Sequence, residues 1–293
     1  MKRVMFGLAV AALVFVSGCI ESTTLLDVKK DGSGKIVVRE FMSPQVTQMM
    51  DGMGNMFAGM EVAGAKPAEP VEKKSMFKDM IDGKLKHFGE GVELVSSEEL
   101  TNKQGWKGYT ATYSFKDINN ISIAMGDSEA TGGGEISVPG DTKEEKEDDS
   151  SAADYTFKFV GGDSCKLQII SAGKEDADDV AVEPVAGTEG MEEMGDQMMA
   201  GMGAMMGPML KGMRLTFIVR VEGKIKQTNS AYPWKDRANT ITVMDMPVDK
   251  MLGNPEAMKL MQSQDDSALA KIEKLGIEGV KLEKAGKTIE IEF

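Results

Sequence analysis

Apolar and polar residues alternate over several stretches of the chain, and this period of two predicts β-strands. In residues 105–115, GWKGYTATYSF, one side of the predicted strand carries Tyr109, Ala111, Tyr113 and Phe115. Further strand-like stretches occupy residues 155–160, 165–170, 215–221 and 239–246. Glycine-containing turns at 31–34 and 161–163 join neighbouring stretches and predict two hairpins. The last residues, 279–293, predict a third hairpin, GVKLEKAGKTIEIEF.

Helical signals interrupt the strand pattern at four places. Ser43-Pro44 has the residue types of an N-cap followed by proline at the first helical position. Residues 75–88, SMFKDMIDGKLKHF, place their apolar side chains on one helical face. Asn254-Pro255 predicts the start of a third helix, and a fourth is expected to end at Gly276.

The first residues combine a charged start with a short apolar run. The run, Val4–Val16, has 13 residues, fewer than the about 18 that a membrane-spanning helix needs. The following Val16-Ser17-Gly18-Cys19 resembles the lipobox of bacterial lipoproteins, in which a cysteine after small residues receives diacylglycerol. We expect cleavage before Cys19 and two or three acyl chains on it, enough for stable membrane anchoring. The alternative is a plain secretory signal with an unrelated cysteine. If Cys19 is acylated and the source is a diderm bacterium, Ile20 after the cysteine favours the periplasmic face of the outer membrane.

Sequential hairpins and a few helices, without a βαβ rhythm, predict an α+β fold. The expected architecture is an antiparallel sheet built from hairpins with several packed helices. Acidic stretches near 126–153 and 171–190 predict long flexible loops. We expect residues 1–18 to be a signal peptide, residues 19–252 to form the α+β ectodomain, and residues 253–293 to add helices and a hairpin packed on the same domain.

The chain is strongly acidic. Its net charge of −13 at pH 7 becomes −15 once Lys2 and Arg3 leave with the signal peptide. This charge argues against nucleic acid as a partner, because Lys and Arg supply that affinity. Anionic lipid headgroups would also repel this charge, so we expect the acyl anchor to hold the protein at the membrane. With Cys19 acylated, Cys165 has no disulfide partner, and its apolar surroundings in the sequence predict a buried thiol.

Sequence motifs for catalysis are absent, including GxSxG, HExxH, CxxC and the nucleotide-binding loops. The stretch DGSGK at 31–35 lacks the spacing of a phosphate loop and is interpreted as a turn. His87 is the single histidine and cannot form a metal cluster or a catalytic triad alone. We therefore predict a non-enzymatic protein with no catalytic residue, no cofactor and no metal site.

Methionines concentrate in two segments: 14 of the 25 lie in residues 49–60 and 191–213. In the second segment they recur at helical spacing and form a stripe. One interpretation is ordinary packing, with flexible thioethers filling gaps. A second is an adaptable apolar surface for a lipid, a hydrophobic peptide or a partner helix, and a third is Cu(I) binding. The second interpretation makes four residues candidate ligand contacts: Met198, Met202, Met205 and Met209.

The order of these pieces resembles the LppM-type domain of bacterial envelope lipoproteins. The resemblance covers most of residues 20–252 in outline and rests on Cys19 and four stretches: DGSGKIVV, WKGYTATYSFKDINNI, MRLTFIVRVEGKIKQTN and NTITV. It implies a lipid-anchored α+β ectodomain and, by analogy with mycobacterial members, contact with envelope glycolipids. No catalytic residue comes with the family.

These observations lead to one expected function and two alternatives. We expect a lipid-anchored envelope lipoprotein that binds a lipid, a glycolipid or a protein partner at the membrane face. The alternatives are a structural or assembly lipoprotein without a small ligand, and a Met-rich Cu(I)-binding periplasmic protein.

Overall fold

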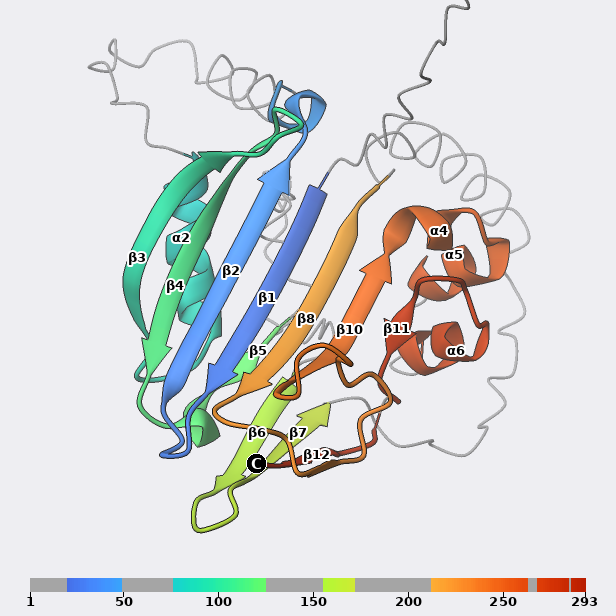
Figure 1. Ribbon diagram of the computed structural model, residues 1–293. Coiled ribbons are helices and arrows are strands. Elements are labelled where there is room, and N and C mark those ends of the chain that lie inside the picture. The colour runs from blue at the N-terminus through green and yellow to red at the C-terminus, as the bar shows by residue number, and fades with distance from the viewer. Residues whose placement is uncertain (1–19, 49–75, 125–154, 172–211, 263–267, 285) are drawn as a thin grey trace, which may run out of the picture.

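A computed structural model describes residues 20–48, 76–124, 155–171, 212–262, 268–284 and 286–293 (Figure 1). Its strands are β1 (Ile20–Val28), β2 (Gly34–Met42), β3 (Glu93–Thr101), β4 (Lys107–Phe115), β5 (Ser122–Ile123), β6 (Tyr155–Val160), β7 (Lys166–Ser171), β8 (Arg214–Val221), β9 (Gln227–Thr228), β10 (Thr240–Pro247), β11 (Lys281–Leu282) and β12 (Ile289–Glu292). The helices are α2 (Met76–His87), the 3-10 turn η1 (Ile118–Asn120), α4 (Val248–Leu252), α5 (Pro255–Gln262) and α6 (Ala268–Lys274).

The larger sheet has seven strands in the order β11-β10-β8-β1-β2-β4-β3. Strand β1 is parallel to β8, and the other neighbours are antiparallel. The α+β class is therefore confirmed in outline, but the prediction of a purely antiparallel sheet is wrong. Strands dominate, and the helices of the described residues are few and short. The β1–β8 pair joins residues such as Leu25 and Ile218, which are too far apart in sequence for local pattern to reveal.

A second, five-stranded antiparallel sheet has the order β5-β6-β7-β12-β9. The predicted C-terminal hairpin over residues 279–293 is wrong, because its two halves enter different sheets. Leu282 of β11 pairs with Met244 of β10 in the large sheet, whereas β12 pairs with β7 and β9. Both halves bury their apolar side chains in the common core, Leu282 at 5% exposure and Ile291 at 1%.

One face of the large sheet is covered by α2 and by the small sheet (Figure 1). Aromatic side chains mark both contacts. Phe77 of α2 lies 5.9 Å from Tyr109 of β4, and Tyr155 of β6 lies 5.1 Å from Phe217 of β8, measured between ring centroids. These rings belong to one hydrophobic core that includes residues from both sheets and from α2.

Most local predictions are confirmed. The β1–β2 hairpin turns through Gly32, whose φ of 81° suits glycine. The side chain of Asn254 accepts hydrogen bonds from the N–H groups of Glu256 and Ala257 at 3.0 and 3.1 Å, which caps α5 as predicted. Gly276, at φ 61°, follows α6 as expected. The hairpin around 161–163 joins β6 to β7.

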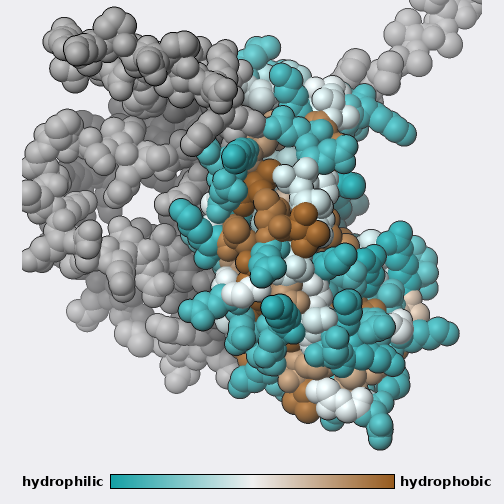
Figure 2. Space-filling view, turned by 90° about the vertical axis from the view of Figure 1, so that its left-hand side faces the viewer, coloured by the Kyte–Doolittle hydropathy of each residue, from teal (hydrophilic) through white to brown (hydrophobic). Residues whose placement is uncertain are grey.

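Strand β3 was not predicted from the sequence. It is the edge strand of the large sheet beside β4, and eight of its nine residues are exposed. The pairing shifts between Leu94 and Ser96, so a bulge lies at Val95, which is 55% exposed. Figure 2 faces this flank and shows hydrophobic surface gathered between polar residues. A bulge and charged side chains are common protections for a free sheet edge.

Candidate functional site

The residues predicted to carry function lie outside the part of the chain that the structure describes. This applies to Cys19 and to the proposed ligand contacts Met198, Met202, Met205 and Met209. It applies equally to the predicted loops near 126–153 and to nearly all of 171–190. The structure does, however, fix the points at which several of these segments join the fold.

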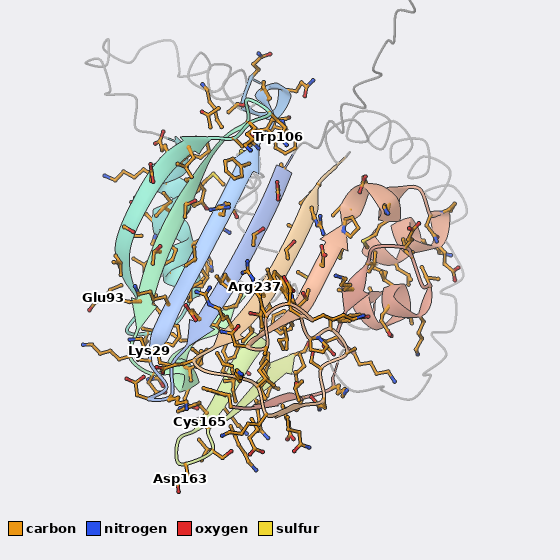
Figure 3. All side chains as sticks on the ribbon, in the orientation of Figure 1. Lys29, Glu93, Trp106, Asp163, Cys165 and Arg237 are labelled. Atoms are coloured by element: carbon orange, nitrogen blue, oxygen red, sulfur yellow. The ribbon has the colours of Figure 1, made fainter. Side chains whose placement is uncertain are left out.

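The end of the large sheet at which β1 begins is defined by strand register. Ile20 pairs with Met42, and Met42 pairs with Lys107 on the next strand. On the other side of β1, Arg214 opens β8 and pairs with Pro247. We call this row, Ile20, Met42, Lys107, Arg214 and Pro247, the Ile20 end. Figure 3 shows Trp106 at this end and Lys29, Asp163 and Cys165 toward the opposite one.

Both Met-rich segments are connected to the fold at the Ile20 end. After β2 ends at Met42, a helix begins at Pro44, with the Thr47 N–H donating to the Ser43 carbonyl at 3.1 Å. The described residues stop at Gln48, just before the first Met-rich segment, and resume at Met76. A separate gap, residues 172–211, holds most of the second Met-rich segment and ends at Gly212, just before β8. The carbonyl of Met213 accepts a 2.7 Å hydrogen bond from the Val248 N–H, which holds this connection beside the end of β10.

Residues 102–107, which connect β3 to β4 and include the first residue of β4, also lie at the Ile20 end, and we call them the β3–β4 loop. Its sequence, NKQGWK, contains two lysines, one tryptophan and no acid. Lys103 and Lys107 are exposed, and Trp106 is half-buried. Tryptophan and lysine together are typical of protein surfaces at a membrane interface.

Arg214, the other basic residue in the row, pairs with a buried carboxylate, although its own side chain is 53% exposed. Its guanidinium donates two 2.7 Å hydrogen bonds to the carboxylate of Asp245, whose side chain is 8% exposed. The hydrogen bond to Asp245 is the main cause that raises the pKa of Arg214. Among the described basic residues at this end, Lys103 and Lys107 are therefore best placed to meet an external anion.

A buried polar cluster lies under α2, two residues from the Ile20 end. The carboxylate of Glu40, a residue 5% exposed, accepts hydrogen bonds from Ser22 at 3.0 Å and from Tyr109 at 2.7 Å. Lys84 of α2 lies 2.9 Å from the same carboxylate. Burial and the charge of Glu40 raise the pKa of Tyr109. These side chains have their hydrogen-bonding and charged partners within the protein. The contact of Lys84 with Glu40 therefore attaches α2 to the sheet.

Sequence reasoning missed this cluster although a signal exists. Glu40 follows Ile36 and Val38 at a spacing of two, which places a carboxylate on the buried face of β2. A charge at such a position requires partners. The partner Lys84 comes from a helix that was predicted correctly, but the pairing itself is not visible in the sequence.

The remaining candidates of the sequence analysis carry no site in the described structure. Cys165 is 2% exposed, which confirms the predicted buried thiol. His87 lies in the last turn of α2 and is exposed. Among the described residues, no group of three or more His, Cys, Asp or Glu side chains is arranged to hold a metal ion. None of the helices described has the length and apolar character needed to cross a bilayer.

Comparison with known proteins yields little. No protein-family model and no curated protein matches the chain. Among solved structures, the chain is similar to the folded domain of LppM from Mycobacterium tuberculosis, determined by NMR. The identity is 8% and the TM-score 0.31, over 94% of this chain and 89% of that chain. This is a weak fold-level resemblance, and it transfers neither a ligand nor a residue role.

Proposed function

We propose that the chain is an envelope lipoprotein, held at the membrane by acyl chains on Cys19, and that it binds a ligand without transforming it. The observation that carries the proposal is the start of β1 at Ile20, one residue after that cysteine. Strand β1 lies inside the large sheet between β2 and β8. An anchor on Cys19 would therefore be attached to the rigid part of the fold without a linker.

This short connection has a geometric consequence. One extended residue advances the chain by about 3.3 Å, so acylated Cys19 would keep the Ile20 end within several ångströms of the membrane surface. Two or more acyl chains suffice for a stable anchor. The opposite end of the large sheet, where β1 turns into β2, would point away from the bilayer.

We propose a lipid or glycolipid as the ligand. Both Met-rich segments join the fold at Gln48 and Gly212, at the end nearest to the proposed anchor. Methionine side chains are flexible and polarizable, and they suit irregular apolar ligands. A non-enzymatic role is supported by the absence of catalytic motifs and by the internal satisfaction of the Glu40 cluster.

The anchor is tested by metabolic labelling with a fatty acid and by membrane fractionation. Replacement Cys19→Ala should abolish labelling and release the protein from the membrane fraction. Replacement Cys165→Ala is the matched control and should change neither property. A Cys19→Ala protein that remains labelled would refute the anchor.

The ligand is tested separately with the mature chain carrying Cys19→Ala. This protein is mixed with vesicles that contain a fluorescent phospholipid, and soluble complexes are isolated by gel filtration. We expect lipid to co-elute with the protein, and expect replacement of Met198, Met202, Met205 and Met209 by glutamine to reduce it. Absence of co-eluting lipid would refute lipid binding and leave the anchor standing.

A further inference from the structure

We propose that the β3–β4 loop, residues 102–107, is a second membrane contact that seats the Ile20 end on a bilayer with anionic headgroups. The inference rests on the proposed anchor at Cys19 and deepens it, because it assigns a surface and a lipid class to the same end of the protein. It names Trp106 as the residue in the membrane interface and two lysines, Lys103 and Lys107, as the headgroup contacts.

Strand register places the loop at the level of the anchor. Lys107 is in register with Met42, and Met42 with Ile20, so only β2 separates β4 from β1. Two strand spacings amount to about 10 Å between Lys107 and Ile20. A membrane surface that meets Ile20 can therefore also meet the β3–β4 loop, provided that the sheet stands on this end.

The loop is held in one conformation by its own hydrogen bonds. The side-chain oxygen of Asn102 accepts from the N–H groups of Gln104 and Trp106 at 3.0 and 2.9 Å. The Asn102 N–H donates to the Trp106 carbonyl at 3.0 Å, and the Gly105 N–H donates to the Asn102 carbonyl at 3.0 Å. Gly105 has a φ of 80°, which favours glycine. This closed turn fixes the backbone that carries Lys103 and Trp106, which lowers the ordering cost at binding.

The charge of the loop is opposite in sign to that of the chain. The whole sequence carries −13, whereas residues 102–107 contain two lysines and no acid. Lysines near an anionic leaflet are attracted within about a Debye length, and tryptophan prefers the headgroup region. The acidic body would be repelled by the same surface. Both effects favour the orientation in which this loop faces the bilayer.

The two tryptophans of the chain allow a direct test. The indole N–H of Trp234 donates to the Thr242 hydroxyl at 2.9 Å, and Thr242 pairs with Ile218. Ile218 is four residues along β8 from Arg214, so this indole lies about 13 Å from the Ile20 end. The acylated Trp234→Phe protein therefore reports on Trp106 alone, and the acylated Trp106→Phe protein reports on Trp234.

Each protein is reconstituted into vesicles of phosphatidylcholine and phosphatidylglycerol that contain lipids brominated close to the headgroup. We expect strong quenching of Trp106 and little quenching of Trp234. In the Trp234→Phe background, Lys103→Gln with Lys107→Gln should lower the quenching on anionic vesicles. The matched pair Lys158→Gln with Lys166→Gln, exposed on the β6–β7 hairpin, should leave it unchanged.

The outcomes separate this inference from the proposed function. Vesicle-bound, acylated protein with unquenched Trp106 would overturn the loop contact and leave the anchor intact. Equal quenching of Trp106 and Trp234 would also overturn it, because the fold would then have no fixed orientation. A chain that carries no acyl group when isolated from its membrane would overturn the proposed function, and this inference with it.

Discussion

The phenol of Tyr109 donates a 2.7 Å hydrogen bond to the carboxylate of Glu40 on the neighbouring strand. The two residues are directly paired across β2 and β4, and both are buried. Ser22 and Lys84 reach the same carboxylate from β1 and from α2. Glu40 therefore connects three strands and one helix just below the Ile20 end.

Replacement Glu40→Gln should destabilise the protein by about 2 kcal/mol, because it weakens hydrogen bonds to a buried charge and removes the partner of Lys84. Urea unfolding of the Cys19→Ala protein measures the change. Glu98→Gln, at an exposed position on β3, is the matched control and should stay within about 0.5 kcal/mol of the parent. Equal stability of the two variants would contradict the assigned role of Glu40.

Two glycines should respond to alanine in opposite directions. A Cβ at Gly108 would lie 1.9 Å from the Glu40 carbonyl oxygen, so Gly108→Ala must displace backbone and should cost on the order of 3 kcal/mol. A Cβ at Gly83, within α2, would meet no atom beyond its own helical turn within 4 Å, and Gly83→Ala should stabilise by roughly 0.5–1 kcal/mol. Thermal and urea unfolding measure both; a stabilising Gly108→Ala would contradict the close approach of β2 and β4.

Stability should fall steeply above pH 10. Burial is the main cause that raises the pKa of Tyr109, Tyr113 and Tyr155, the last to about 12. In the unfolded chain these phenols ionise near pH 10, whereas the folded protein retains their protons. Unfolding then releases protons, so each tyrosine lowers the unfolding free energy by about 1.4 kcal/mol per pH unit. For Tyr155 the loss begins near pH 10 and levels off above its folded pKa of about 12.

Urea unfolding at several alkaline pH values, together with phenolate absorbance, tests this dependence. Tyr155→Phe removes one of the phenolic protons that unfolding releases, so the stability of this variant should decline less steeply with pH than that of the parent. Below about pH 9 the two proteins should show a constant difference. A parallel decline of both proteins above pH 10 would show that Tyr155 ionises freely in the fold.

Local patterns predicted the elements that alternate or carry caps. Strand β4 was found because Tyr109, Ala111 and Tyr113 share its buried face, and α5 because Asn254 precedes Pro255. Strand β3 was missed because it is an edge strand with both faces exposed, so its sequence does not alternate between apolar and polar residues. Strands that bury one face can therefore be predicted from the sequence, whereas an exposed edge strand cannot.

Long-range pairings could not be predicted from the sequence. The parallel contact of β1 with β8 and the separation of β11 from β12 depend on which buried surface each strand completes. The same limit applies to the candidate site. Lys103 and Trp106 are ordinary loop residues in the sequence, and only the register of Lys107 with Met42 and Ile20 brings them level with the anchor.

The thiol of Cys165 should be inert until β12 separates from β7. Its sulfur faces the carbonyls of Lys30 and Gly162, and its backbone exchanges two hydrogen bonds with Phe293, at 3.1 and 3.0 Å. In the Cys19→Ala protein, a thiol reagent should therefore react with Cys165 far more slowly than with a thiol introduced by Asp163→Cys at the exposed hairpin tip.

Phe293→Ala should accelerate the reaction of Cys165, because residue 293 is 1% exposed and its loss leaves a cavity worth about 3 kcal/mol or more beside β7. The rate measures local opening of the β7–β12 pair at concentrations of denaturant too low for global unfolding. If Cys165 reacts at the same rate with and without the phenyl ring, the pairing of β12 with β7 does not protect the thiol. A rate that rises only with global unfolding would place the protection in the core as a whole.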